Sequence, residues 1–246
     1  MFVILNAVKN PRISSLLVLS LALPSLLAPV SFAQDAPQPP PSTRAHVTFT
    51  FERKGLPVPR YQLTVNEDGT GLYQGESIVD AVGGYAESTE RPPESFTNSV
   101  TISQPTVTRI FKLSQQLNHF NKPCASKAKN IADTGTKILS YSGPEGAGSC
   151  TYNYSDIKEV QALTDIFQGI AETMDQGRRL DHLHRYDRLG LDDAITFFNQ
   201  EVTAGRALEV GTIAASLRSI ASDADLMVRV RSRASALLAL IPTESH

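Results

Sequence analysis

The side chains best suited to chemistry are gathered in residues 181–187, a segment with two histidines and two aspartates. On a strand, His182 and His184 would point toward one metal ion. The surrounding hydrophobic spacing predicts a helix instead, where positions two apart diverge by roughly 200°, so only His184 with Asp181 or Asp187 could share a face. A metal site normally needs three or four convergent ligands. We therefore expect a solvated helix with local charge pairs; a metal centre is the alternative.

Two other patterns are similar to ligand-binding loops. Asn66, Asp68 and Thr70 match the first half of a calcium loop, but Ser77 stands at the twelfth position, where such loops need a glutamate. The glycines between residues 143 and 148 could belong to a phosphate loop. Those loops open a helix, whereas a strand-like sequence follows here. We predict a hairpin turn in both places.

The sequence marks no nucleophile, because the G-x-S-x-G pattern of a nucleophile elbow is absent. Asp156 and Glu159 have the spacing of a capping box, and Asp192 and Asp193 stand where a helix N-cap is expected. We therefore predict no catalytic, cofactor-binding or metal-ligating residue and no cofactor. The alternative is a hydrolase or metal-dependent enzyme whose residues come together only in the fold.

Tyrosines are concentrated on the predicted strands. An exposed row of them would form a recognition face for a peptide or glycan. Cross-strand packing of the rings against helices is the alternative, and it is the one we favour. The residues concerned are Tyr61, Tyr73, Tyr141, Tyr152 and Tyr154.

The N-terminus has the features of a cleavable secretory signal. Lys9 and Arg12 precede an uncharged, mainly apolar run over residues 13–28, and small residues lead to an expected cleavage point between Ala33 and Gln34. We therefore predict an exported protein, periplasmic or secreted, with residues 1–33 as the signal peptide.

An uncleaved membrane anchor is the alternative, because residues 13–33 are just long enough to cross a bilayer. Pro24 and Pro29 disfavour it, since each removes a backbone donor and kinks a helix. We expect no stable membrane anchor after cleavage.

The chain has two cysteines, Cys124 and Cys150, which lie 26 positions apart. In an oxidising compartment an even number of cysteines favours a disulfide, which would join a helix to the sheet. The net charge of −2 and the pI near 6.2 disfavour a nucleic-acid binder, which would need a basic surface.

Alternating apolar and polar residues predict an α+β fold. Residues 34–45 are proline-rich and form an expected linker. Beyond them we expect a mainly antiparallel sheet of five or six strands, formed by segments near 47–51, 61–65, 70–74, 96–102, 137–142 and 149–154.

Two amphipathic helices should cover one face of this sheet. Pro105 suits the first turn of one helix, and the other begins after Asp156. Beyond Gly177 the strand signal ends and several helices follow. We predict an α+β domain over residues 46–175 and a helical region over residues 178–242.

Two resemblances accompany this pattern. Residues 51–53, 59–65 and 68–75 resemble the P-x-Y-x-L-T-[IV]-x-x-D-G-T core of an uncharacterised family of exported bacterial domains. Members often carry a cysteine beside the proline, where this chain has Val58. The resemblance implies an exported β-rich module and no catalytic residue. Residues 230–238 are similar to the second helix of a HEAT repeat; an ordinary amphipathic helix is the alternative.

We expect an exported, soluble binding module that performs no catalysis, with a protein partner of unknown identity. Arg229 and Arg233 are spaced to lie together on the outer face of the last helix, where they could bind an acidic partner. An ordinary solvated face is the alternative. The oligomeric state is not predicted.

Overall fold

The computed structural model describes residues 44–78 and 93–242. The predicted signal peptide, its cleavage point at Ala33 and Gln34, and most of the linker lie outside these residues. Among the residues described, no helix is both long enough and apolar enough to cross a membrane.

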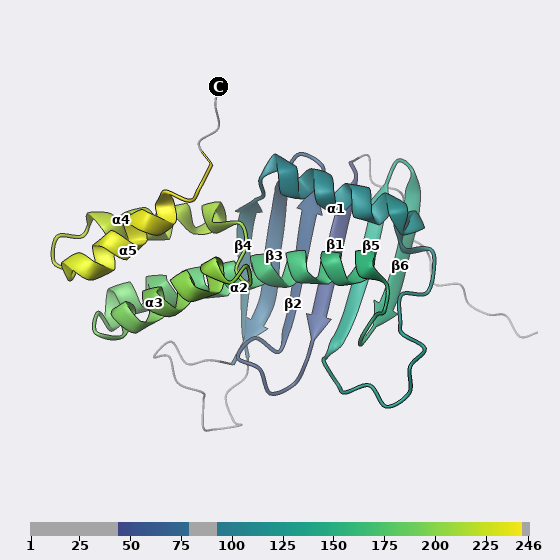
Figure 1. Cartoon of the computed structure of the whole chain (residues 1–246), viewed down its shortest axis with the longest axis horizontal. Coiled ribbons are helices and arrows are strands. Elements are labelled where there is room, and N and C mark those ends of the chain that lie inside the picture. Colours follow the sequence, from purple (N-terminus) through teal and green to yellow (C-terminus); the bar gives the residue numbers. More distant parts are fainter. Residues whose placement is uncertain (1–43, 79–92, 243–246) are drawn as a thin grey trace, which may run out of the picture. The chain divides into compact units, whose positions relative to one another are not determined.

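Six strands form one antiparallel sheet in the order β4-β3-β2-β1-β5-β6 (Figure 1). The predicted α+β fold is confirmed. The central strand β1 pairs with both β2 and β5, so that Phe49 lies opposite Leu63 and Leu139. The strands are β1 (His46–Glu52), β2 (Arg60–Asn66), β3 (Thr70–Ser77), β4 (Glu94–Thr101), β5 (Thr136–Gly143) and β6 (Gly146–Tyr152).

Two helices, α1 (Gln104–Gln116) and α2 (Lys158–Tyr186), cross the same face of the sheet (Figure 1). Pro105 lies in the first turn of α1, as predicted. The remaining helical elements are η1 (Asn118–Phe120), α3 (Gly190–Thr203), η2 (Val210–Ile213), α4 (Ala214–Ser222) and α5 (Val228–Leu238).

The alternation of the strands separates a buried face from a polar face. Val47, Phe49 and Phe51 point into the core, whereas Thr48 and Thr50 are only partly covered. Four of the five strand-region tyrosines pack in this core, which supports the packing interpretation: Tyr61, Tyr73, Tyr141 and Tyr152 are buried and Tyr154 is exposed.

Helix α2 is continuous through the expected boundary between residues 175 and 178. Gly177 does not end the helix. An ideal Cβ built on it would lie 2.4 Å from the side chain of Ile213, so this glycine allows η2 to pack closely against α2. The buried residues of the sheet, α2 and the C-terminal helices belong to one hydrophobic core.

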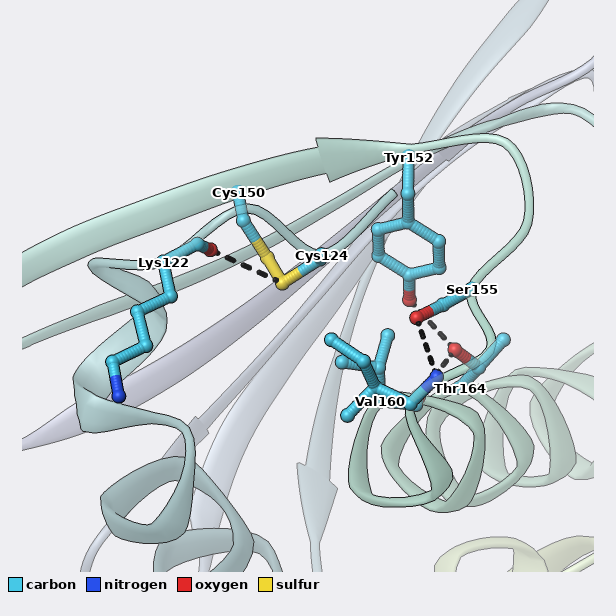
Figure 2. Close-up of a disulfide and its surroundings, with 8 residues drawn as sticks. Lys122, Cys124, Cys150, Tyr152, Ser155, Val160 and Thr164 are labelled. Atoms are coloured by element: carbon cyan, nitrogen blue, oxygen red, sulfur yellow. Dashed lines mark hydrogen bonds between the residues drawn. A yellow bond between two sulfur atoms is a disulfide. The ribbon is translucent and has the colours of Figure 1, made fainter. Parts of the chain in front are cut away.

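The predicted disulfide joins Cys124 and Cys150, whose Cα atoms are 5.7 Å apart (Figure 2). It connects the segment after η1 to β6. Nearby, the Tyr152 hydroxyl lies 2.6 Å from the Thr164 hydroxyl and so joins β6 to α2. The disulfide therefore ties β6 to the segment after η1, and the hydroxyl contact ties β6 to α2.

The capping box predicted at Asp156 and Glu159 is wrong. Helix α2 begins at Lys158, and no side chain caps it. The Asp156 carboxylate instead accepts a hydrogen bond from the Ser126 hydroxyl. The helix start is thus displaced from the position that the sequence indicates.

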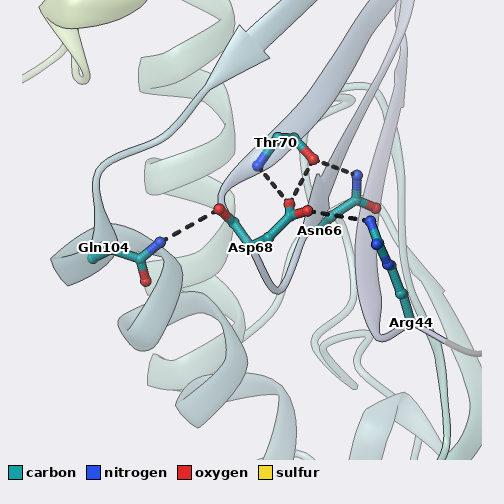
Figure 3. A network of polar contacts seen from close by, with 5 residues as sticks. All are labelled: Arg44, Asn66, Asp68, Thr70 and Gln104. Carbon is teal, nitrogen blue, oxygen red and sulfur yellow. Dashed lines mark hydrogen bonds and ion pairs between the residues drawn. The ribbon is translucent and has the colours of Figure 1, made fainter.

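The calcium-like pattern is a hairpin turn between β2 and β3 (Figure 3). The Asp68 carboxylate accepts hydrogen bonds from the backbone N–H and the hydroxyl of Thr70, at 2.9 and 2.5 Å. These bonds lower the pKa of Asp68. The pattern serves to close the turn, as an Asp-Gly sequence commonly does.

Candidate functional site

The structure separates the two histidines of residues 181–187. His184 Nε2 lies 2.8 Å from the Asp223 carboxylate, so it connects α2 to the residues that follow α4. His182 packs against Tyr186 with ring centroids 4.8 Å apart and the ring planes tilted by 38°. Within residues 44–78 and 93–242, no group of three His, Cys, Asp or Glu side chains could hold a metal ion.

Arg229 and Arg233 lie together on α5, but both guanidinium groups bind the Asp192 carboxylate. The distances are 2.8 Å to Arg229 Nε and 2.5 Å to Arg233 Nη1. The predicted cap role of Asp192 is also wrong, because α3 begins at Gly190 and has no side-chain cap. The two arginines thus have an intramolecular acidic partner, which the sequence did not reveal because α3 and α5 are far apart along the chain.

A hollow lies beside α2, between that helix, the loop after β1 and the end of α3. Its volume is about 1150 Å³. A second hollow of about 350 Å³ adjoins it, since Thr134, Asp165 and Gln168 line both. We call the two together the α2 groove. From Gln161 to Leu183 the helix lines the groove over roughly 33 Å, at about 1.5 Å per residue.

The wall opposite α2 has an apolar part. Phe51 and Tyr61 contribute to it at the strand ends, and Leu56, Pro57 and Val58 from the loop between β1 and β2. Polar side chains complete this wall, namely Arg53, Ser77, Glu94 and Thr134. The aromatic packing continues from Tyr61 to Tyr73, whose ring centroids are 5.5 Å apart. This wall could cover the apolar part of a bound chain.

A carboxylate and a guanidinium lie at the floor of the groove. Arg178 Nη1 is 3.3 Å from Asp175 Oδ1, and the same guanidinium stacks 3.7 Å from the centre of the Phe96 ring. Water reaches 28% of the Asp175 side chain, but protein atoms surround the rest. This burial raises the pKa of Asp175 to about 7, against the opposing effect of Arg178.

The Tyr73 hydroxyl adds to this cluster. Tyr73 is fully buried, and its hydroxyl makes no hydrogen bond of regular geometry, yet it lies close enough to Asp175 to interact with the carboxylate. Burial, followed by the charge of Asp175, raises the pKa of Tyr73 far above its ordinary value. The phenol therefore stays protonated and can donate to Asp175.

Farther along the groove two more acidic side chains face the same space. Glu172 Oε1 accepts a hydrogen bond of 2.9 Å from Gln176 Nε2. The Gln176 carbonyl oxygen is buried without a hydrogen-bond partner. Asp165, two turns earlier on α2, is exposed, and no ion pair joins it to the described part of the chain. This region therefore holds two acidic side chains, with the donors of Gln168, Gln176 and Arg179 in the same lining.

Arg53 and Arg179 also line the hollow, while two other cations near it are engaged by neighbouring groups. Arg206 donates to both oxygens of Glu201, at 2.7 and 2.6 Å. In the smaller hollow, the Lys137 ammonium is within 3.2 Å of the carbonyl oxygens of Thr134, Gly135 and Asn153. Burial lowers the pKa of Lys137. Its contacts show a structural lysine that holds the loop before β5.

Sequence reasoning missed the α2 groove. The periodicity of α2 identifies its buried face, but Asp165, Gln168 and Glu172 read as an ordinary solvated face. The only available signal was the length of the polar stripe, which continues for the whole helix. The opposite wall comes from residues more than a hundred positions earlier, and no local pattern connects the two.

No protein-family model matches this sequence, and no curated protein is detectably similar to it. The resemblance to exported β-rich domains and the likeness of residues 230–238 to a HEAT helix therefore stay predictions.

Proposed function

We propose that this chain is an exported binding module that holds an extended segment of a protein partner in the α2 groove. The observation that carries this proposal is the length of the groove. About ten residues of extended chain, at roughly 3.3 Å each, match the 33 Å of α2 that line it.

The composition of the walls supports a peptide as the occupant. A bound peptide offers backbone donors and acceptors together with side chains of mixed polarity. The groove opposes an apolar wall at Leu56, Val58 and Tyr61 to polar side chains such as Gln161 and Gln168 on α2. Apolar side chains of the segment would pack on the first wall, and its amides would bond to the second.

The disulfide supports the exported location. Cys124 and Cys150 are bonded, and structural disulfides persist in oxidising compartments. This supports our proposal that the protein acts in the periplasm or outside the cell, as the signal sequence predicted for residues 1–33 also implies.

Selection of displayed dodecapeptides on the folded protein tests the proposal. Selected peptides should shift the NMR signals of α2 and of residues 53–58. The variant Gln168→Trp, which fills the groove where its two hollows meet, should weaken binding at least tenfold. The matched control is Gln62→Trp, on the exposed polar face of β2, and it should bind as the parent does. Peptides that bind only outside the groove, or equal binding by both variants, would refute the proposal.

A second candidate function follows from Asp175. A carboxyl group with a pKa near 7 beside a protonated phenol could act as a general acid or base in an enzyme. Turnover of a substrate in a panel of esters, glycosides and peptides, with loss of turnover in Asp175→Asn, would establish this alternative. The stacking and pairing of Arg178 give the carboxylate a structural role as well, so we rank binding first.

A further inference from the structure

We propose that a segment bound in the α2 groove is held together with a proton, which the Asp175 carboxyl group takes up as the segment enters. This inference rests on the proposed function and specifies how pH regulates the same site. The occupant remains an extended peptide segment, and it binds more tightly in a mildly acidic medium than in an alkaline one.

The first argument is the position of Asp175 at the floor of the groove. Its side chain lines the larger hollow, and water reaches 28% of it. Tyr73, which lies close to it on β3, is fully buried. The carboxyl group is therefore hydrated from the groove. An occupant that covers it removes this water, and loss of water disfavours the charged form of a carboxyl group.

The second argument is that the protein compensates this carboxylate only in part. Among the described residues, the one hydrogen bond of regular geometry to it comes from Arg178 Nη1, which lies 3.3 Å from Oδ1. The same guanidinium stacks 3.7 Å from the centre of the Phe96 ring, and it does not make the two parallel bonds of a bidentate pair. A covered groove therefore leaves the second oxygen with neither water nor a regular donor from the described chain.

The third argument concerns what the occupant brings to this point. Burial and then the charge of Asp175 raise the pKa of Tyr61, so this part of the apolar wall lies near the carboxyl group. An apolar side chain of the segment that packs on Tyr61 covers Asp175 without donating a hydrogen bond. A proton supplies what the segment does not, because a protonated carboxyl group is uncharged and carries its own donor.

Titratable side chains surround Asp175 on every neighbouring element. Burial is the main cause that raises its pKa to about 7, and Glu172 adds to the rise, whereas Arg178 and the Tyr73 hydroxyl oppose it. Burial also raises the pKa of Tyr61 and that of Tyr73, so both phenols keep their protons. The other titratable side chains that line the same hollow are Arg53, Glu94, Asp165, Arg179, His182, Glu201 and Arg206. Histidine ordinarily titrates near neutral pH, so His182 needs a control of its own.

The direction of the pH effect follows from the loss of water. Binding raises the pKa of Asp175 above its value of about 7 in the free protein. Between these two pKa values the complex carries a proton that the free protein lacks, so the affinity falls as pH rises. A rise of one unit on binding would weaken binding about fivefold between pH 6 and pH 8.

The experiment uses the full exported protein and a dodecapeptide that is selected on it at pH 6 for binding in the α2 groove. The peptide is acetylated and amidated at its ends and contains no histidine, cysteine or acidic residue, so it does not titrate in this range. Calorimetric titration at pH 6, 7 and 8, in buffers of different ionisation enthalpy, gives the affinity and the proton uptake. The parent should weaken about fivefold and take up about half a proton between pH 7 and pH 8.

Three variants assign this proton. Asp175→Asn should bind the peptide equally at pH 6 and pH 8 and take up no proton, because its amide does not titrate. Asp181→Asn removes a carboxylate of the same helix that lines neither hollow, and His182→Gln removes the histidine; both should keep the fivefold change. Retention of the pH dependence in Asp175→Asn, or its loss in His182→Gln, would overturn the inference.

A measurement on the parent alone covers the case in which Asp175→Asn does not fold. The carbon-13 shift of the Asp175 carboxyl group, followed by NMR, should titrate at a higher pH in the peptide complex than in the free protein. An equal or lower midpoint in the complex, or an affinity independent of pH, would overturn this inference and leave the proposed function standing. Absence of any groove-binding peptide would overturn both.

Discussion

Glu209 binds the start of helix α1 at Ser103, from a position 106 residues away in sequence, and we call this contact the Glu209 cap. Its carboxylate accepts hydrogen bonds from the backbone N–H of Ser103 at 2.9 Å and from the Ser103 hydroxyl at 2.7 Å. The Thr106 hydroxyl donates to the same group at 2.5 Å. Glu209 itself has left-handed backbone angles, with φ 57° and ψ 50°. The Glu209 side chain therefore connects the helical region to α1, while the backbone of the same residue has an unfavourable conformation.

Replacement of Glu209 should separate these two effects. Glu209→Ala removes the cap and keeps the backbone cost, so the free energy of unfolding should fall by about 1–2 kcal/mol. Glu209→Gly also removes the cap but relieves the left-handed conformation, and it should be about 1 kcal/mol more stable than the alanine variant. Urea denaturation of both variants measures the difference. Equal stabilities would show that the backbone angles carry no cost.

The strands and the disulfide were predictable because their signals are local. Alternation at Val47, Phe49 and Phe51 gives the buried face of β1 directly, and two cysteines allow only one intramolecular pair. Glu209 is different. Its sequence neighbourhood contains no sign of Ser103, since the contact exists only after η2 packs against α2 and places the carboxylate at the start of α1.

The pairing of Asp192 with Arg229 and Arg233 gives a second prediction. The double change Arg229→Glu, Arg233→Glu should place three carboxylates together and lower stability by about 1–2 kcal/mol. Adding Asp192→Lys should restore most of the loss. Arg218→Glu, an exposed position on α4, is the control. Thermal unfolding that is unchanged in the double variant would show that the ion pairs contribute nothing.

The disulfide should contribute through the chain it closes. Cys124 and Cys150 are 26 positions apart, and in the loop-entropy account a loop of this size stabilises the fold by roughly 3–4 kcal/mol. The double variant Cys124→Ser, Cys150→Ser should lose that amount in chemical denaturation. Intact mass after alkylation without reductant should show no modified cysteine in the parent protein. Two alkylated thiols would mean that the bond does not form.

The same contrast between local and tertiary signals applies to the groove. The hydrophobic spacing of α2 shows which residues enter the core, but it cannot show that Asp175 meets Tyr73 and Arg178. That meeting depends on the angle at which α2 crosses β3 and β4. The partly buried Asp175 carboxylate is therefore not apparent in the sequence, although its pKa has the largest shift among the carboxyl groups of the described residues.

Asp175 should make the stability of the protein depend on pH in an unusual direction. Its pKa is raised from 3.8 to about 7 in the folded state, chiefly by burial. Between these two values the folded state binds more protons than the unfolded state, so the contribution of Asp175 to stability falls as pH rises. Below pH 4 the group contributes no penalty; above pH 7 the penalty is complete, with a ceiling of about 4 kcal/mol.

The variant Asp175→Asn should remove this dependence, because its amide keeps the shape of the carboxyl group and cannot ionise. The stability difference between the variant and the parent, measured by urea denaturation, should therefore move in favour of the variant as pH increases from 4 to 8. Asp165→Asn changes an exposed carboxylate on the same helix and should leave the pH slope of the parent intact. A difference for Asp175→Asn that stays constant over this range would show that Asp175 ionises at the same pH in the folded and unfolded chains. In that case an acid–base role for Asp175 near neutral pH would lose its basis.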